Sequence, residues 1–152
     1  MTVSPKKLNT FLLFKLPSAY FCGVRTKSLD ENSCVVSVKH RWFNQNPFKS
    51  MFWAVQGMAA ELTTGALIMS KIRNSGHKIS MLVASNNGSF TKKATGRITF
   101  TCNEGKNIDE AIKNAIATGE GQTVWLNSKG INSEGIQVSE FNFEWTIKVR
   151  SK

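Results

Sequence analysis

The chain has few of the residues that build metal centres and disulfide frameworks. It holds three cysteines and two histidines in 152 residues, and no pair of cysteines has the Cys-x-x-Cys spacing. An odd, widely spaced set of cysteines excludes a disulfide scaffold and a cysteine-based zinc site, and is typical of a reducing compartment. His40 and His77 are too few and too far apart for a typical zinc site. We therefore expect no metal or redox cofactor, and a cytoplasmic protein whose Cys34 and Cys102 lie inertly in the core.

Acidic residues are also scarce, at 10 Asp and Glu against 20 Lys and Arg, which gives a net charge of +10. Such a surface attracts anions, including nucleic acid, anionic lipid and phosphorylated ligands. The basic residues are scattered along the chain, with no Lys- and Arg-rich block and no nucleic-acid-binding motif. A basic surface protein that binds nucleic acid or anionic lipid stays open as an alternative, although nucleic acid is not the expected partner.

A secretory leader is imitated at the N-terminus but not completed. The apolar residues 11–14 follow two lysines, yet Lys15 interrupts the run and Pro17 ends it. We expect residues 4–16 to form a short amphipathic helix instead. The side chains expected to face the body of the protein are Leu8, Phe11, Leu12 and Leu16.

No hydrophobic run is suited to cross a bilayer. The longest weakly charged stretch, residues 50–70, approaches the length of a transmembrane helix, but Glu61 stands at its centre. A helix buried inside the protein fits this stretch better, because its residues are apolar nearly all round. We therefore expect no transmembrane segment.

Apolar residues make up 41% of the chain, and ten Phe and four Trp supply large side chains for a core. This length and composition predict a single domain over residues 1–152. The expected strands are residues 22–29, 33–43, 79–91, 97–103, 122–127 and 136–150. The expected helices after the first are residues 50–72 and 107–118, the latter capped by Asn107. Because strands and helices do not alternate, an α+β class with a mainly antiparallel sheet is expected.

Two local patterns refine this order. Within residues 79–91, Asn86-Asn87-Gly88 is compatible with a hairpin turn or with a bulge in one long strand. The last strand carries the clearest alternation of the chain, which predicts one buried face. Its expected inward side chains are Phe141, Phe143, Trp145, Ile147 and Val149.

Residues 46–62 resemble the hotdog-fold thioesterase superfamily, in which an antiparallel sheet wraps one long central helix. In the phenylacetate-pathway type, an Asn precedes a His-Gly-Gly at the start of that helix, and an Asp or Glu follows nine positions after the His. Without gaps, Asn46 matches the Asn, Phe52-Trp53-Ala54 fall on the His-Gly-Gly, and Glu61 falls on the acid. Residues 90–97 resemble the strand-to-strand corner of the superfamily, which favours the bulge. The amino-acid sequence of this central segment looks closer to an uncharacterised bacterial branch of these proteins than to any enzyme group of known substrate.

The resemblance implies a homodimer that hydrolyses acyl-coenzyme A or acyl-carrier-protein thioesters, with coenzyme A present only as part of the substrate. The start of the central helix in one subunit would face the acid of the other. Glu61, Asn46 and the backbone N–H of Trp53 are the implied catalytic groups. The implied substrate-binding residues are Phe52, Ala54, Met58, Lys92, Lys93 and Arg97.

The chain departs from the superfamily pattern at the start of the helix. Two glycines would let a ligand approach the backbone closely, whereas Phe52, Trp53 and Ala54 stand here. The departure leaves a non-catalytic protein that binds acyl thioesters or fatty-acyl groups as the first alternative. Glu61 could then be a buried structural partner, and Asn46 a turn residue.

Overall fold

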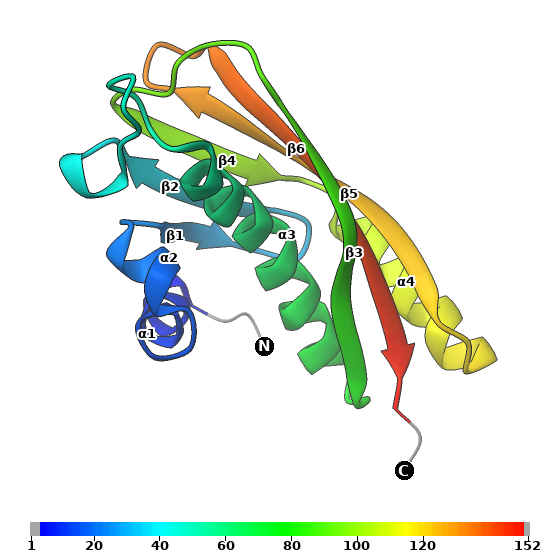
Figure 1. Ribbon diagram of the computed structural model, residues 1–152. Coiled ribbons are helices and arrows are strands. Elements are labelled where there is room, and N and C mark those ends of the chain that lie inside the picture. The colour runs from blue at the N-terminus through cyan, green and yellow to red at the C-terminus, as the bar shows by residue number, and fades with distance from the viewer. Residues whose placement is uncertain (1–3, 151–152) are drawn as a thin grey trace.

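The computed structural model describes residues 4–150 (Figure 1). Its helices are α1 Pro5–Lys15, α2 Pro17–Phe21, α3 Trp53–Ser75 and α4 Gly105–Thr118, with a 3₁₀ turn at Trp42–Asn44. Its strands are β1 Arg25–Leu29, β2 Cys34–Lys39, β3 Ile79–Phe90, β4 Arg97–Cys102, β5 Gln122–Asn132 and β6 Gln137–Val149. Within residues 4–150 the strands form one sheet in the order β1-β2-β4-β5-β6-β3, and every neighbouring pair is antiparallel. The predicted α+β class is confirmed.

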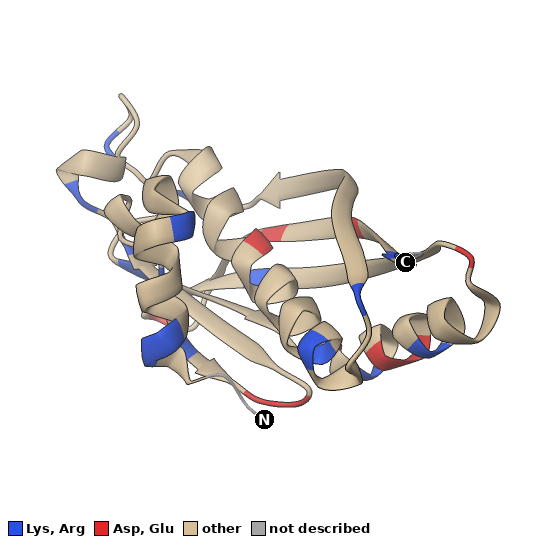
Figure 2. Cartoon of the chain, turned by 90° about the horizontal axis from the view of Figure 1, so that it is seen from below, with Lys and Arg blue, Asp and Glu red and all other residues tan. Residues whose placement is uncertain are grey.

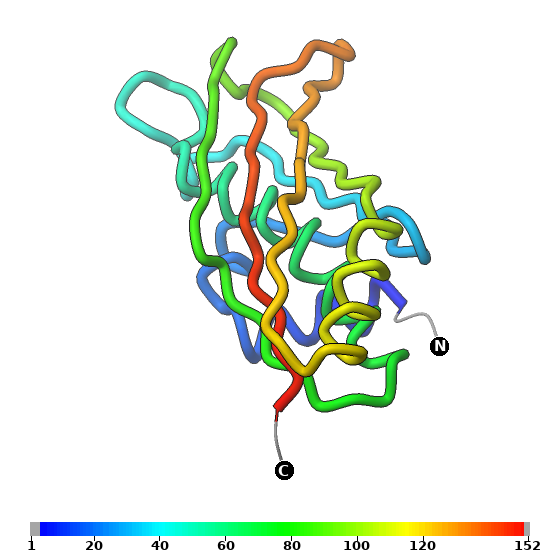
Figure 3. Tube along the Cα trace, turned by 90° about the vertical axis from the view of Figure 1, so that its right-hand side faces the viewer, coloured from blue at the N-terminus to red at the C-terminus, as the bar shows by residue number. Residues whose placement is uncertain are grey.

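The long helix α3 lies along one face of the curved sheet (Figures 1 and 3). It packs against β2, β4, β5 and β6, and α4 lies beside the ends of β5 and β6. Ala59 and Leu67 of α3 are fully buried, as is Phe100 of β4 on the sheet side of the core. A helix surrounded this way needs apolar residues on most of its circumference, which explains its sequence.

The start of α3 lies three residues later than the sequence predicts. Residues 46–51 form a tight loop before the helix, in which Ser50 bonds to the side chain of Asn46. Phe52 is the N-cap residue, with no side-chain capping bond, and Gly76 ends the helix with φ +70°. The helix therefore runs to Ser75, because a glycine adopts the left-handed C-terminal conformation at no steric cost.

The N-terminal helix buries fewer of its apolar side chains than the sequence predicts. Leu8 and Leu12 are buried against the body, as predicted, but Phe11 and Leu16 are 38% and 40% exposed. Leu16 is the N-cap residue of α2, where Pro17 starts a second helix that the sequence reading misses. The change of direction at Leu16 turns its side chain away from the stripe that continues α1.

Strands β3, β5 and β6 follow the sequence prediction closely, but not at every end. Residues 79–90 form one strand, as the resemblance favours, but its irregularity lies between Val83 and Ser85 rather than at Asn86-Asn87-Gly88. β5 continues to Asn132, five residues past its predicted end. Phe141, Phe143, Trp145 and Ile147 are buried, which confirms the predicted inward face of β6 for these four residues, whereas Val149 at the end of the strand is only half-buried.

Two further expectations are settled by packing. α4 begins at Gly105 after Glu104, not at an Asn107 cap, because Gly105 fits against the backbone of Glu31, where a side chain would collide. Cys34 and Cys102 lie opposite each other on β2 and β4 and are fully buried. Burial raises the pKa of the two thiols to about 12 and about 11, so both are inert, as expected.

Candidate active site at the start of the central helix

A cavity of about 540 Å³ opens at the N-terminus of α3. It is bounded by the loop before the helix, by the first turn of the helix, and by residues 90–94 after β3. Five of the residues singled out by sequence line it, namely Asn46, Phe52, Trp53, Lys92 and Lys93. The fold therefore brings together two segments that are some forty residues apart in the chain.

The first amides of α3 face outward without partners. Phe52 N donates to Asn44 O at 2.9 Å, and the amides of Val55 and Gln56 donate back to Phe52 O at 3.0 and 3.4 Å. Among the loop and cap hydrogen bonds of residues 4–150, neither the amide of Trp53 nor that of Ala54 has an acceptor. Free N–H groups and the partial positive charge of a helix start suit an anionic oxygen.

Asn46 uses its amide to shape the loop. Its Oδ1 accepts from the backbone N–H groups of Phe48 at 2.9 Å and Ser50 at 3.2 Å. Its Nδ2 donates to Ser50 Oγ at 3.0 Å and to Met51 O at 3.4 Å. The residue lines the cavity, but every hydrogen bond of its side chain is spent within the loop, which fits the reading of Asn46 as a turn residue.

Glu61 lies on α3 more than two turns beyond the helix start and does not line the cavity. Its carboxylate rests over Gly65 and beside the indole of Trp145, since a methyl group built on Gly65 would lie 3.2 Å from Glu61 Oε1 and 3.4 Å from that ring. Within residues 4–150 no hydrogen bond or ion pair holds the carboxylate. Burial raises the pKa of Glu61 above the usual range of a carboxyl group.

A buried hydrogen-bond chain fixes the surroundings of this carboxylate. Trp145 Nε1 donates to Thr64 Oγ1 at 3.0 Å, and that hydroxyl donates to the backbone carbonyl of Glu61 at 2.9 Å. The chain links β6 to α3 and holds the indole edge against the carboxylate. Glu61 is half-buried beside this chain, and the loss of solvent around its carboxylate disfavours the charged form.

The three cations predicted at the corner do not act together. Lys93 Nζ donates to Phe48 O at 3.2 Å, and Lys92 Nζ lies 3.9 Å from a carboxylate oxygen of Glu134, with both side chains exposed. Arg97 donates to Ser37 Oγ at 3.3 Å and is not part of the cavity lining. The two lysines therefore supply the positive charge at the cavity.

Ala54 and Met58 are half-buried on α3 and lie outside the cavity lining. Met58 packs against the core cluster, so the structure supports its reading as a core residue better than as a pocket residue.

Gln56 belongs to the cavity but is absent from the sequence-based set. Gln56 lines the cavity and is 4% exposed. Its Oε1 atom is buried and has no hydrogen-bond partner. A buried acceptor without a partner is costly in a folded protein, and such groups are commonly matched by a ligand. The signal in the sequence is an amide in the first turn of a helix whose other faces are apolar.

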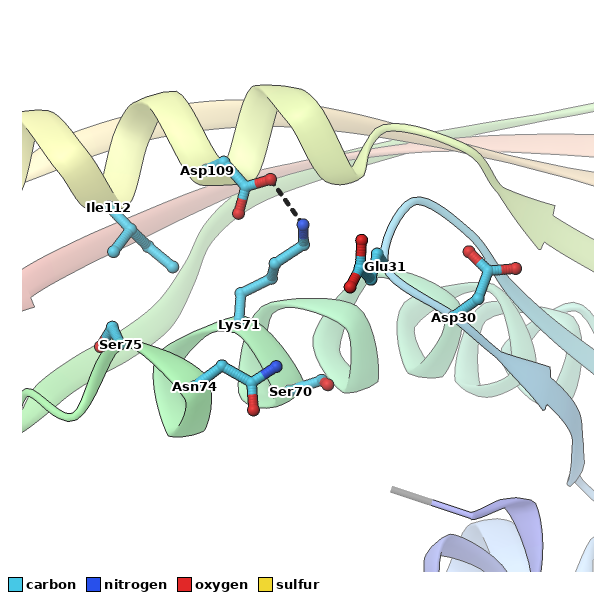
Figure 4. Close-up of a pocket in the computed structure, with 8 residues that line it drawn as sticks. All are labelled: Asp30, Glu31, Ser70, Lys71, Asn74, Ser75, Asp109 and Ile112. Carbon is cyan, nitrogen blue, oxygen red and sulfur yellow. Dashed lines mark hydrogen bonds and ion pairs between the residues drawn. The ribbon is translucent and has the colours of Figure 1, made fainter. Parts of the chain in front are cut away.

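A second cavity, of about 360 Å³, lies at the other end of α3 between the β1–β2 turn and α4 (Figure 4). Its charges are already engaged: Lys71 Nζ pairs with Asp109 at 2.5 Å, and Asp30 accepts from the amides of Asn32 and Ser33. Hydrogen bonding from Ser33 lowers the pKa of Asp30. The described residues contain no group of three or more side chains suited to hold a metal ion.

Residues 6–147 match the family described as Domain of unknown function (DUF4442), and the chain belongs to that family. No match was found among curated proteins. The chain is also similar to several solved structures. A protein of unknown function from Pseudomonas aeruginosa, described as a probable thioesterase, shares 19% identity with a TM-score of 0.82, over 96% of this chain and 97% of that one.

Two further structures are similar at comparable coverage. A protein of unknown function from Chlorobaculum tepidum shares 18% identity at a TM-score of 0.82, over 96% of this chain and 94% of that one. A thioesterase from Haemophilus influenzae shares 12% identity at a TM-score of 0.73, over 98% and 93% of the two chains. These likenesses show a fold shared with structures that are described as thioesterases, as the resemblance in the sequence predicts. None of the helices within residues 4–150 has the length and hydropathy that a bilayer crossing requires.

Proposed function

We propose that the protein is a hotdog-fold thioesterase that hydrolyses acyl-coenzyme A or acyl-carrier-protein thioesters. The observation that carries this proposal is the pairing of unpartnered amides at a helix start with an unpartnered carboxylate on the same helix. The amides of Trp53 and Ala54 would bind the thioester oxygen as it gains negative charge. Glu61 would take a proton from water, which attacks the carbonyl carbon, and the C–S bond breaks with release of the thiol.

The raised pKa of Glu61 supports the role of a general base. A carboxylate whose pKa is raised accepts a proton more readily than an ordinary surface carboxylate. A buried carboxylate that serves no chemistry would instead be expected to have an ion pair or hydrogen bonds. Within residues 4–150 Glu61 has neither.

A single chain cannot place both groups on one substrate, because Glu61 is about 13 Å along the helix axis from Phe52 at 1.5 Å per residue. A two-fold dimer resolves this, since the helix start of one copy can face the acid of the other. The free edge of β3 supports such a dimer: it ends the sheet, and Leu82 on it is 67% exposed. Light scattering at micromolar concentration should give the mass of a dimer, and a strictly monomeric mass would count against the composite site.

Lys92 and Lys93 would attract the phosphate groups of coenzyme A at the cavity mouth. Replacing both with Ala should weaken coenzyme A binding and flatten its dependence on salt, because the exposed charges act through a screened field. The matched comparison is between Lys93→Ala and Arg97→Ala, each of which removes one positive charge. Arg97 is bonded to Ser37 and lies outside the cavity lining, so only Lys93→Ala should weaken binding. Equal losses in both variants would move the anion site away from this cavity.

The experiment that tests the function is a hydrolysis screen of the purified protein over a panel of acyl-coenzyme A thioesters, read by release of free thiol. Turnover of at least one thioester above the rate in buffer supports the proposal. A protein that binds acyl-coenzyme A but hydrolyses none of the panel supports the non-catalytic alternative instead. The exposed bulk of Trp53, 58% accessible where the superfamily has glycine, is the observation that favours this alternative.

A further inference from the structure

Four aromatic side chains stand in solvent at one corner of the molecule, which we call the aromatic corner. Phe21 at the end of α2 is 59% exposed; Trp42, Phe43 and Phe48, from the loop between β2 and α3, are 82%, 61% and 71% exposed. This loop projects from the body in both side views (Figures 1 and 3). Single exposed aromatic residues are ordinary, but several on adjoining segments mark an interaction surface.

The corner is held in shape by a buried polar residue. Asn44 is 2% exposed, and its Oδ1 accepts from the backbone N–H of Arg41 at 2.8 Å. Its Nδ2 donates to Cys22 O and to Lys39 O, each at 2.9 Å. These bonds join the segment after α2 to the 3₁₀ turn, so Phe21, Trp42 and Phe43 are presented by a fixed framework.

Phe48 is presented in a similar way at the tip of the loop. Its amide donates to Asn46 Oδ1 at 2.9 Å, and its carbonyl accepts from Lys93 Nζ at 3.2 Å. The next residue, Lys49, has a left-handed backbone with φ +58°. A non-glycine residue in this conformation is uncommon and needs support from its surroundings, which the Asn46 bonds provide.

The segments that carry the exposed aromatic rings contain only positive charges. Residues 4–29 and 32–60 contain no Asp or Glu, Arg41 directly precedes Trp42, and Lys49 directly follows Phe48. The acidic Glu134 lies on the same side of the molecule, where it pairs with Lys92. In Figure 2 helix α1 carries blue segments, and neither α1 nor α2 carries red. The nearest acidic residues in the sequence, Asp30 and Glu31, lie on the β1–β2 turn beside the C-terminal end of α3.

We propose that the aromatic corner docks onto the surface of an anionic lipid bilayer. Aromatic rings suit the boundary between headgroups and acyl chains, and cations beside them are attracted to anionic headgroups. An acidic carrier protein would satisfy the cations, but its polar surface would leave the four rings without an apolar partner.

Docking would set the candidate active site beside the membrane. Phe48 is at once the tip of the corner and part of the lining of the cavity at the start of α3. A long-chain acyl group could then enter the cavity without crossing bulk water. The docking itself is independent of hydrolysis, because Glu61 takes no part in it and because vesicle binding can be measured without any thioester.

Co-sedimentation with vesicles tests the proposal directly. Wild-type protein should bind vesicles of phosphatidylcholine with 30% phosphatidylglycerol in 0.1 M salt, bind pure phosphatidylcholine vesicles far less, and detach as salt is added. Trp42→Ser combined with Phe43→Ser should lower the partition coefficient at least about tenfold, through loss of buried apolar area. Trp125→Ser combined with Ile136→Ser is the matched control, because it removes exposed apolar side chains elsewhere and should bind as wild type.

Separate variants test the contribution of the cation beside the rings and the insertion of Trp42 into the bilayer. Lys49→Gln should lower partitioning about fivefold, whereas Lys113→Gln on α4 should have little effect, since a cation contributes only near the surface. Trp42→Phe should keep vesicle binding but lose most of the blue shift of tryptophan fluorescence that accompanies it. The proposal is overturned if wild type does not bind the anionic vesicles, if the Trp42 and Phe43 variant binds as wild type, or if the corner binds an acidic carrier protein and no vesicle.

Discussion

Replacing Glu61 with Gln separates the catalytic reading of this residue from the structural one. The substitution keeps the shape of the side chain over Gly65 and beside Trp145 but removes its charge and its ability to accept a proton from water. If Glu61 is the general base, kcat on the best thioester should fall at least about a hundredfold, which is about 2.7 kcal/mol in the barrier. Substrate binding should change little, because the cavity at the helix start does not include Glu61.

The same variant should be more stable than wild type at neutral pH. Burial raises the pKa of Glu61 above its ordinary value of 4.5, so the folded protein favours the protonated form. Wild type therefore loses stability as pH rises from about 4.5 through the raised pKa, and below 4.5 the cost vanishes because the group is protonated in both states. Urea unfolding should give the Gln variant a higher free energy of unfolding than wild type at pH 7, and an equal free energy of unfolding at pH 4.

Glu110→Gln is the matched control for both measurements, because Glu110 is an exposed carboxylate on α4. It should leave turnover unchanged and should not reproduce the pH-dependent gain in stability. An active Glu61→Gln enzyme would refute the assignment of the base and turn attention to Asn46, whose amide lines the cavity. A Gln variant that is less stable than wild type at pH 7 would show that the carboxylate has a stabilising partner, which contradicts its apolar setting.

Three further substitutions on α3 distinguish the site from the fold. Gly65→Ala should push the Glu61 carboxylate aside and lower turnover. In Gly57→Ala the new methyl group would meet only Phe141, at 3.6 Å, so this variant should raise the free energy of unfolding by up to about 1 kcal/mol and leave turnover intact. Equal turnover in both glycine variants would mean that the position of the carboxylate is unimportant. Gln56→Leu should raise the free energy of unfolding by removing a buried acceptor without a partner, and should weaken acyl-coenzyme A binding measured by calorimetry. Unchanged binding would assign that amide to the fold alone.

The elements that sequence predicts well are those whose pattern is local. The alternation along β6 has a period of two residues, and one of its faces is buried throughout, so Phe141 to Ile147 could be placed without knowing their neighbours. The existence of α3 follows from a long apolar run with a glycine at its end. Its first residue could not be predicted, because the loop before it is fixed by side-chain bonds of Asn46 and Asn44 rather than by helix propensity.

The candidate site shows the same division. The resemblance names Glu61 and the residues at the helix start as candidates from spacing alone, and the cavity brings Asn46, Phe52 and Trp53 together but does not include Glu61. It could not supply the neighbours of Glu61, because Trp145 comes from a strand more than eighty residues later. Nor could it distinguish Arg97 from the two lysines, since only the sheet register directs its side chain toward Ser37.

The loss of the His-Gly-Gly pattern removes space at the helix start more than it removes chemistry. The groups suited to hold an oxyanion are backbone amides, and every residue other than proline provides one. Phe52 precedes the first turn as its N-cap, and a cavity of about 540 Å³ remains beside it. What the bulky side chains alter is the wall of that cavity, where Phe52 and Trp53 pack edge to face with ring centres 6.1 Å apart. Under the proposed function, an aromatic wall would favour apolar acyl groups, so these side chains would bear first on which thioester binds and only then on whether it is hydrolysed.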